Sequence, residues 1–135
     1  MQRPNPSSNL GMHHIALFVQ NFESCLFFYS ELLDMSIEWQ PDEDNVYLSS
    51  GSENLALHRI PQHITFAPNQ VLDHIGFILR TPEDVDIWYN YLVANQVTIK
   101  AEPRIHRDGA KSFYCLDPDG NTVQMLYHPP LSQGK

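Results

Sequence analysis

The apolar residues of this chain fall into short runs that occur in both halves. The first run covers positions 14–19 and the second covers positions 74–79, and each begins with a histidine. Continuous apolar runs of this length predict buried strands. Five residues recur 60 positions later in the chain: His14/His74, Ile15/Ile75, Glu23/Glu83, Tyr29/Tyr89 and Leu32/Leu92. A repeat at a fixed distance predicts an internal duplication of one structural unit.

The first half of the chain reads as one strand, one helix and three further strands. Apolar residues recur at spacings of three and four between Phe22 and about Asp34, which predicts an amphipathic helix. Asn21 precedes it and is expected to cap its N-terminus. Polar or proline-containing turns separate the strands that we expect after the helix, at 37–40, 46–49 and 55–60. The predicted order is therefore β-α-β-β-β.

The second half repeats this order after a linker at 62–72. Its helix is expected to begin with Thr81 as the N-cap and Pro82 in the first turn. Its strands are expected at 73–79, 97–100, 112–116 and 122–127, with a polar loop at 104–110 and a turn at 117–120. These assignments predict one domain at 12–129, made of modules 12–61 and 72–129, between a flexible N-terminal tail at 1–11 and a C-terminal tail at 130–135.

Composition narrows the classes of function. The chain has 135 residues and a net charge of −8, which disfavours binding to nucleic acids or anionic membranes. No apolar stretch reaches the roughly 20 residues of a transmembrane helix, and the N-terminus shows no hydrophobic signal sequence. Cys25 and Cys115 lie far apart in the sequence. We therefore expect a reduced, cytoplasmic protein in which both thiols are packed in the core.

The duplicated unit resembles the vicinal oxygen chelate superfamily, which includes glyoxalase I, fosfomycin resistance enzymes, bleomycin-binding proteins and extradiol dioxygenases. The residues that carry the likeness include His-His-Ile-Ala-Leu-Phe-Val at 13–19, Asp-His-Ile-Gly-Phe at 73–77 and Leu-Asp-Pro-Asp-Gly-Asn at 116–121. The likeness covers residues 12–129. It implies an α+β fold in which two tandem β-α-β-β-β modules form a curled mixed sheet of two half-barrels around a central cavity, with the helices outside. It also implies a homodimer.

The resemblance further implies a divalent metal held by the first and last strands of each module. His14 and His74 match the first-strand positions, whereas Gln124 and Ala56 stand at the last-strand positions. Relatives often have a carboxylate there, but glutamine is a neutral donor and alanine cannot bind a metal. His58 lies two residues after Ala56, so on a strand both side chains share one side, and His58 is a further candidate ligand. Without a carboxylate, Fe, Ni, Zn or Mn is expected rather than Mg or Ca.

The substrate of such a site is expected to be a small oxygenated molecule. An anionic substrate would suit the basic residues His58, Arg59, Arg107 and Lys111, together with Arg104, which lie at predicted strand ends or in the predicted loop. These basic side chains could equally balance a surface rich in Asp and Glu. No catalytic residue is assigned, because glyoxalase and dioxygenase chemistry in relatives uses a carboxylate that is missing here.

Two functions from different classes remain open. The first is a metal-dependent enzyme of the glyoxalase or dioxygenase type, either a lyase or isomerase or a dioxygenase, and its feature is the His14/His74 pair. The second is a metal-free protein that binds and sequesters a small molecule, as bleomycin-binding relatives do. Its features are the missing carboxylates and an aromatic content of 11%. In the second case the two histidines would only line a pocket.

Overall fold

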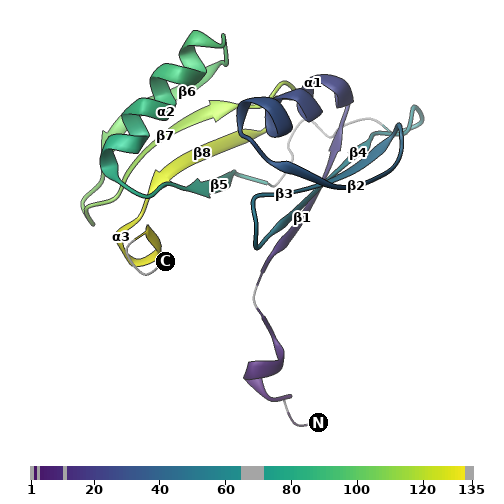
Figure 1. Cartoon of the computed structure of the whole chain (residues 1–135), viewed down its shortest axis with the longest axis horizontal. Coiled ribbons are helices and arrows are strands. Elements are labelled where there is room, and N and C mark those ends of the chain that lie inside the picture. The colour runs from purple at the N-terminus through teal and green to yellow at the C-terminus, as the bar shows by residue number, and fades with distance from the viewer. Residues whose placement is uncertain (1, 3, 11, 65–71, 133–135) are drawn as a thin grey trace. The chain divides into compact units, whose positions relative to one another are not determined.

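The computed structural model describes residues 2, 4–10, 12–64 and 72–132, so most of the predicted linker lies outside the described residues. The chain divides into two compact units, Met1–Gln62 (unit 1) and His63–Lys135 (unit 2). Each unit contains one four-stranded mixed sheet with a helix packed on it, as Figure 1 shows. The α+β fold class predicted from the sequence is confirmed, whereas the predicted central cavity stays a prediction.

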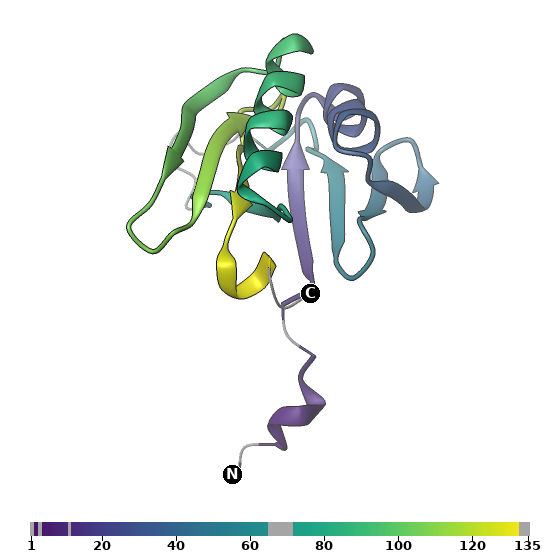
Figure 2. The same cartoon turned by 60° about the vertical axis from the view of Figure 1, so that its left-hand side comes forward.

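Unit 1 has the predicted β-α-β-β-β order. Its strand order across the sheet is β1-β4-β3-β2, in which β1 and β4 are parallel and the other neighbours are antiparallel. Helix α1 lies beside these strands in Figure 2. The elements are η1 (Pro6–Ser8), β1 (His14–Val19), α1 (Phe22–Phe27), the π-helical stretch η2 (Phe28–Leu32), β2 (Ser36–Asp42), β3 (Asn45–Ser49) and β4 (Asn54–Arg59).

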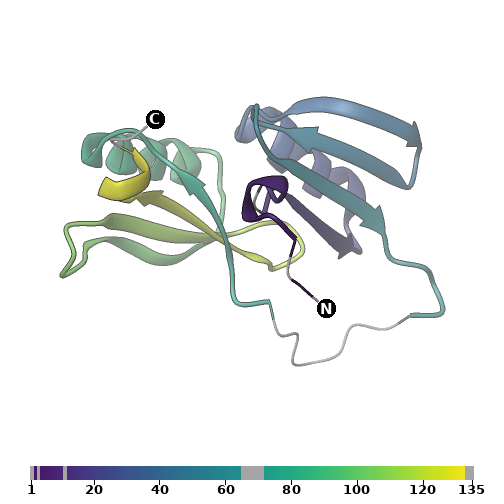
Figure 3. The same ribbon diagram turned by 90° about the horizontal axis from the view of Figure 1, so that it is seen from below.

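Unit 2 repeats the same topology. Its sheet has the order β5-β8-β7-β6, and the parallel pair is again the first and last strand. Helix α2 runs along one face of this sheet, which Figure 3 shows from below. The elements are β5 (Ile75–Ile78), α2 (Pro82–Ala94), β6 (Ile99–Ile105), β7 (Lys111–Leu116), β8 (Thr122–Tyr127) and α3 (Pro129–Ser132). The shared strand order is the structural counterpart of the sequence repeat.

Each sheet has one face packed against its helix and one open face. In β1 the residues Leu17 and Val19 are buried, while the alternating residues His14 and Phe18 are exposed. This alternation follows from the two-residue period of a strand. Fully buried side chains between each sheet and its helix contribute roughly 1.5–3 kcal/mol each to the stability of the fold, because apolar surface is removed from water. They include Val46, Leu48, Leu57 and Tyr29 in unit 1, and Val85, Leu92, Phe113 and Val123 in unit 2.

The helix starts differ from each other. Thr81 and Asp84 form the expected capping box, because the Thr81 hydroxyl accepts from the Asp84 amide while the Asp84 carboxylate accepts from the Thr81 amide. Asn21 stands at the N-cap of α1, but its side chain makes no capping bond, so that part of the prediction was wrong. Both helical segments are followed by a residue with positive φ, Asp34 at 59° and Gln96 at 63°.

Two strands are longer than predicted. Strand β6 continues to Ile105 because Arg104 pairs with Ser112, so the expected loop at 104–110 begins only at His106. Strand β2 continues through Pro41 to Asp42. It is the outer strand of its sheet, where a proline costs no ladder hydrogen bond.

The segments predicted as tails contain local structure. A 3-10 turn forms at Pro6–Ser8, and helix α3 follows the last strand. Ser132 is buried, and its hydroxyl donates to the Leu79 carbonyl at 2.7 Å, which fastens α3 to the end of β5. Among the described residues, no helix is both long and apolar enough to cross a lipid bilayer.

Both cysteine side chains are thiols and are completely buried. Burial raises the pKa of the Cys115 thiol to about 12, so the reactive thiolate is scarce near neutral pH. We expect neither Cys25 nor Cys115 to react with a maleimide in the native protein, and both to react after unfolding in denaturant. Mass spectrometry over a labelling time course measures this, with Ser52→Cys as an exposed positive control. Native labelling of Cys115 at the rate of that control would contradict the packing described.

Candidate functional site

His14 is the first residue of β1 and is exposed on the open face of unit 1. It stands opposite Asn54 in the parallel pairing of β1 with β4. The His14 Nδ1 atom lies 2.7 Å from Asn54 Oδ1, and Asn54 Nδ2 donates to Glu38 Oε2 at 3.3 Å. An amide oxygen only accepts hydrogen bonds, so Nδ1 is the protonated nitrogen of His14. The other ring nitrogen, Nε2, therefore keeps its lone pair for a ligand.

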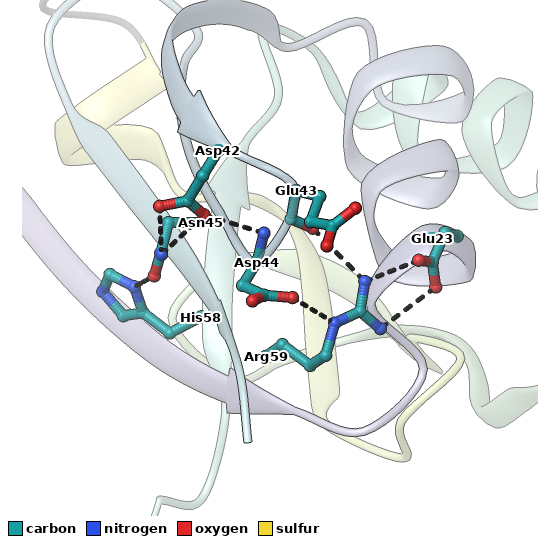
Figure 4. A network of polar contacts seen from close by, with 7 residues as sticks. All are labelled: Glu23, Asp42, Glu43, Asp44, Asn45, His58 and Arg59. Atoms are coloured by element: carbon teal, nitrogen blue, oxygen red, sulfur yellow. Dashed lines mark hydrogen bonds and ion pairs between the residues drawn. The ribbon is translucent and has the colours of Figure 1, made fainter. Parts of the chain in front are cut away.

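His58 lies on the same open face, opposite Phe18. Its Nδ1 atom lies 2.6 Å from Asn45 Oδ1, and Asn45 Nδ2 donates to both oxygens of Asp42 at 2.8 and 3.1 Å, as Figure 4 shows. The ring meets the rings of Phe18 and Tyr47 edge-on, with centroids 6.2 and 5.9 Å away. Ala56 shares this face, as strand parity predicts, and a metal role for His58 stays a prediction.

Arg59 points to the opposite, helix-covered face. Its guanidinium binds the Glu23 carboxylate with two bonds of 3.3 and 2.5 Å and the Asp44 carboxylate at 2.7 Å, and it lies over the Phe22 ring at 4.9 Å (Figure 4). These contacts join the start of α1 to the β2–β3 turn. The guanidinium is thus bound to two carboxylates of its own unit, and we do not include Arg59 among the proposed substrate contacts.

Gln124 occupies the corresponding open face of unit 2, in β8. Its side chain is buried, and Nε2 donates to Ser112 Oγ at 3.1 Å and to Tyr114 Oη at 3.0 Å. With both amide hydrogens engaged, Oε1 is the end that a ligand can reach. Gly76 stands opposite Gln124, and a Cβ at Gly76 would lie 3.8 Å from Oε1. The glycine therefore places no side chain against this oxygen.

His74 precedes β5 and shares a neighbour with Gln124. Its Nδ1 atom lies 2.6 Å from Asp73 Oδ2, so Nδ1 carries the proton here as well. Its ring meets the ring of Tyr114 at nearly a right angle, with centroids 5.5 Å apart. Tyr114 thus contacts both His74 and Gln124. In unit 2, two of the three residues predicted as principal metal ligands thus share one neighbour, and the metal site itself stays a prediction.

Three further residues of the open face escaped the sequence analysis. Ser112 and Tyr114 hold Gln124, and His106 Nε2 lies 2.9 Å from Ser112 Oγ. His106 is half-buried in this network. Strand parity could have placed Ser112 and Tyr114 beside Gln124, because they alternate with the buried Phe113 and Cys115. The partner of His106 depends on the β6–β7 register, which the sequence does not display.

The remaining predicted substrate residues differ in their surroundings. Lys111 lies on the helix-covered face, where its Nζ pairs with Asp86 of α2 at 2.5 Å. Arg107 is exposed in the turn between β6 and β7. Within the part of the chain that the structure describes, no group of three or more His, Cys, Asp or Glu side chains is close enough to hold a metal.

Known proteins match this chain over most of its length. The profile of the Glyoxalase/Bleomycin resistance protein/Dioxygenase superfamily matches residues 11–125. Metallothiol transferase FosB of Staphylococcus haemolyticus (strain JCSC1435) is 30% identical over 116 residues, covering 85% of this chain and 81% of the relative. FosB of Staphylococcus epidermidis (strain ATCC 12228 / FDA PCI 1200) is 30% identical over 120 residues, covering 84% and 79%.

Solved structures agree in fold at lower sequence identity. Lactoylglutathione lyase from Agrobacterium tumefaciens superposes with a TM-score of 0.76 at 20% identity, covering 94% of this chain and 98% of that chain. TioX from Micromonospora sp. ML1 superposes with a TM-score of 0.70 at 12% identity, covering 87% and 98%. Identities this low support the shared fold alone.

The Arg59 cluster predicts a dependence of stability on pH. Hydrogen bonding and charge from Arg59 hold the pKa of Glu23 below its ordinary value. A carboxylate whose pKa is lower in the folded than in the unfolded protein stabilises the folded state at pH values above the unfolded pKa. This stabilisation is lost as the pH falls through the folded pKa. We expect Glu23→Gln to lower the unfolding free energy near neutral pH, and the difference from wild type to vanish in acid. Urea unfolding at several pH values measures it.

The matched control is Glu43→Gln. Glu43 belongs to the same cluster, but Arg59 contacts its backbone carbonyl, which the substitution keeps. We expect a smaller loss of stability near neutral pH for this variant. If the two variants lose equal stability, the bond between Arg59 and the Glu23 carboxylate does not stabilise the fold.

Proposed function

The chain belongs to the Glyoxalase/Bleomycin resistance protein/Dioxygenase superfamily, and from this premise we propose that it is a divalent-metal-dependent enzyme acting on a small oxygenated substrate. The relatives named metallothiol transferases favour transfer of a thiol as the reaction. One observation carries the proposal: His14 and His74 each have Nδ1 bonded to an oxygen, which leaves Nε2 as a metal donor. Metal-binding histidines commonly have this arrangement.

The chemistry of the donors fits a first-row divalent ion. We propose His14, His74 and Gln124 as the ligands, through two imidazole nitrogens and one amide oxygen. Such a set suits Zn, Ni, Fe or Mn better than Mg or Ca, which prefer oxygen ligands. A bound ion would act as a Lewis acid that polarises an oxygen of the substrate.

All three proposed ligands are neutral, in contrast to a set that contains a carboxylate. An ion held by them would keep its full double charge, which favours an anionic oxygen group on the substrate. Within unit 2, Ser112 and Tyr114 would keep the Gln124 oxygen turned outward. His58, whose Nδ1 is held by Asn45, and the exposed Arg107 are the proposed substrate contacts.

A second candidate function is metal-free binding of a small molecule. The observation that favours it is the aromatic character of unit 1, where Trp39 and Tyr47 are stacked with ring centroids 5.2 Å apart and Trp39 is 59% exposed. The exposed Phe18 adds a third ring to the same unit. Such rings offer flat surfaces for a planar or apolar ligand. Retention of a small molecule by protein that lacks metal would support this candidate.

We also propose a homodimer in the cytoplasm. Strands β1 and β5 are each the outer strand of their sheet, so each has one edge without a strand neighbour in its own unit. Exposed strand edges favour pairing with a second chain. Two buried cysteine thiols suit a reducing compartment. We expect sedimentation velocity at micromolar concentration to give the mass of a dimer, and a monomer under these conditions would contradict this assembly.

The metal proposal predicts the result of a titration. We expect metal-free protein to bind about one equivalent of Zn(II), Ni(II), Fe(II) or Mn(II), and His14→Ala/His74→Ala to lose this binding while its circular dichroism stays native. Gln124→Glu should bind more tightly than wild type, because it adds an anionic donor. Isothermal titration calorimetry measures all three affinities.

His13→Ala/His63→Ala is the matched control for the histidine variant. It also removes two histidines, both of them exposed, but neither is a proposed ligand. Its affinity should equal that of the wild type. Wild-type protein without stoichiometric metal binding, or equal losses in the two double variants, would overturn the proposed metal site.

A further inference from the structure

Unit 1 contains the same three-residue arrangement twice. In each copy a histidine Nδ1 lies against an asparagine Oδ1, and the asparagine Nδ2 donates to a carboxylate. The first copy is His14–Asn54–Glu38, with distances of 2.7 and 3.3 Å. The second is His58–Asn45–Asp42, with distances of 2.6 and 2.8 Å. His14 pairs with Asn54, and Asn45 pairs with His58, across neighbouring strands. Both arrangements lie on the open face of the sheet.

The carboxylate decides which way the amide points. A carboxylate at neutral pH accepts hydrogen bonds and donates none, so it selects the NH₂ end of the asparagine. The amide oxygen is then turned to the imidazole, where it selects the tautomer protonated at Nδ1. In the His14 copy, Glu38 on β2 orients the Asn54 amide on β4. The Asn54 amide in turn determines which ring nitrogen of His14 carries the proton and which keeps its lone pair.

Backbone hydrogen bonding also fixes the positions of His14 and Asn54. The Asn54 amide donates to the His13 carbonyl at 2.6 Å, which joins β1 to β4 next to His14. His14 and Asn54 are direct neighbours in the parallel register. The distance between the imidazole and the amide is therefore set by the pairing of β1 with β4.

We propose that Asn54 and Glu38 are positioning residues for His14, which hold its imidazole in the Nδ1-protonated tautomer with Nε2 presented to the metal. The assignment of the tautomer rests on contacts within unit 1 alone, whereas the role toward the metal rests on the proposed function. His74 must also be protonated at Nδ1 to present Nε2 to a metal. There the Asp73 carboxylate contacts Nδ1 directly, at 2.6 Å. The two proposed histidine ligands thus reach one tautomer by different means.

Three variants separate the parts of this arrangement. Asn54→Ala removes the acceptor of His14, and we expect it to weaken Zn(II) binding about ten- to a hundredfold, the usual range for partners of ligating histidines. Asn54→Asp combined with Glu38→Gln restores an oxygen acceptor for His14 and an amide donor for that carboxylate, and should stay within about threefold of the wild type. Glu38→Gln removes only the group that orients the amide, so we expect a loss between these two.

The second copy supplies a matched control. Asn45→Ala removes the same kind of acceptor from His58, which is not one of the three proposed ligands. Its Zn(II) affinity should stay within about twofold of the wild type, and the same titrations measure it. If Asn54→Ala keeps wild-type affinity while His14→Ala destroys binding, Asn54 does not position the ligand and the proposed function still stands.

The tautomer itself is measured without any metal. Long-range ¹H–¹⁵N correlation spectra of metal-free protein labelled with ¹⁵N at histidine distinguish a protonated Nδ1 from a protonated Nε2. We expect His14 to be protonated at Nδ1 in the wild type and to become a mixture of tautomers in Asn54→Ala, while Asn45→Ala changes only His58. A wild-type His14 protonated at Nε2 would overturn the inference, whether or not the protein binds metal. Failure of the titration alone would overturn only the proposed function.

Discussion

The parallel pairing of the first and last strands in each unit is the constraint on which the candidate site depends. In unit 1 this pairing places His14 opposite Asn54, and in unit 2 it places Gly76 opposite Gln124. A shift of one residue would turn every side chain of a strand to the other face. Buried residues such as Val19 and Val123 on the helix-covered faces make that shift costly. The apolar core thus holds the polar residues of the open faces in register.

The same division into two faces separates the basic residues Arg59 and Lys111 from the histidines and Gln124. Arg59 and Lys111 lie on the helix-covered faces, where each pairs with a carboxylate of its own unit. The open faces instead carry histidines and Gln124, whose other polar atoms are bound to asparagine, aspartate, serine or tyrosine side chains. Basic residues therefore support the packing of the helices, and the chemistry proposed here uses neutral nitrogen and oxygen donors oriented by hydrogen bonds.

Much of the fold could be predicted from the sequence because it depends on local periodicity. The repeat at 60 positions, the Thr81 cap and the alternation that places His58 beside Ala56 are all properties of short segments. What could not be predicted depends on which residues face each other across strands. The partners of His14 and His58 come from other strands, and Arg59 binds Glu23, which lies 36 positions away in the sequence. The length of β6 likewise follows from its pairing with β7.

We propose that His14, His74 and Gln124 bind one divalent ion. Anomalous diffraction at the zinc edge from crystals grown with Zn(II) tests it most directly. We expect one strong peak at about 2.0–2.2 Å from Nε2 of both histidines and from Gln124 Oε1, with Nδ1 of His14 still bonded to Asn54 and Nδ1 of His74 to Asp73. A peak that contacts Nδ1, or that lies away from these three side chains, would contradict it.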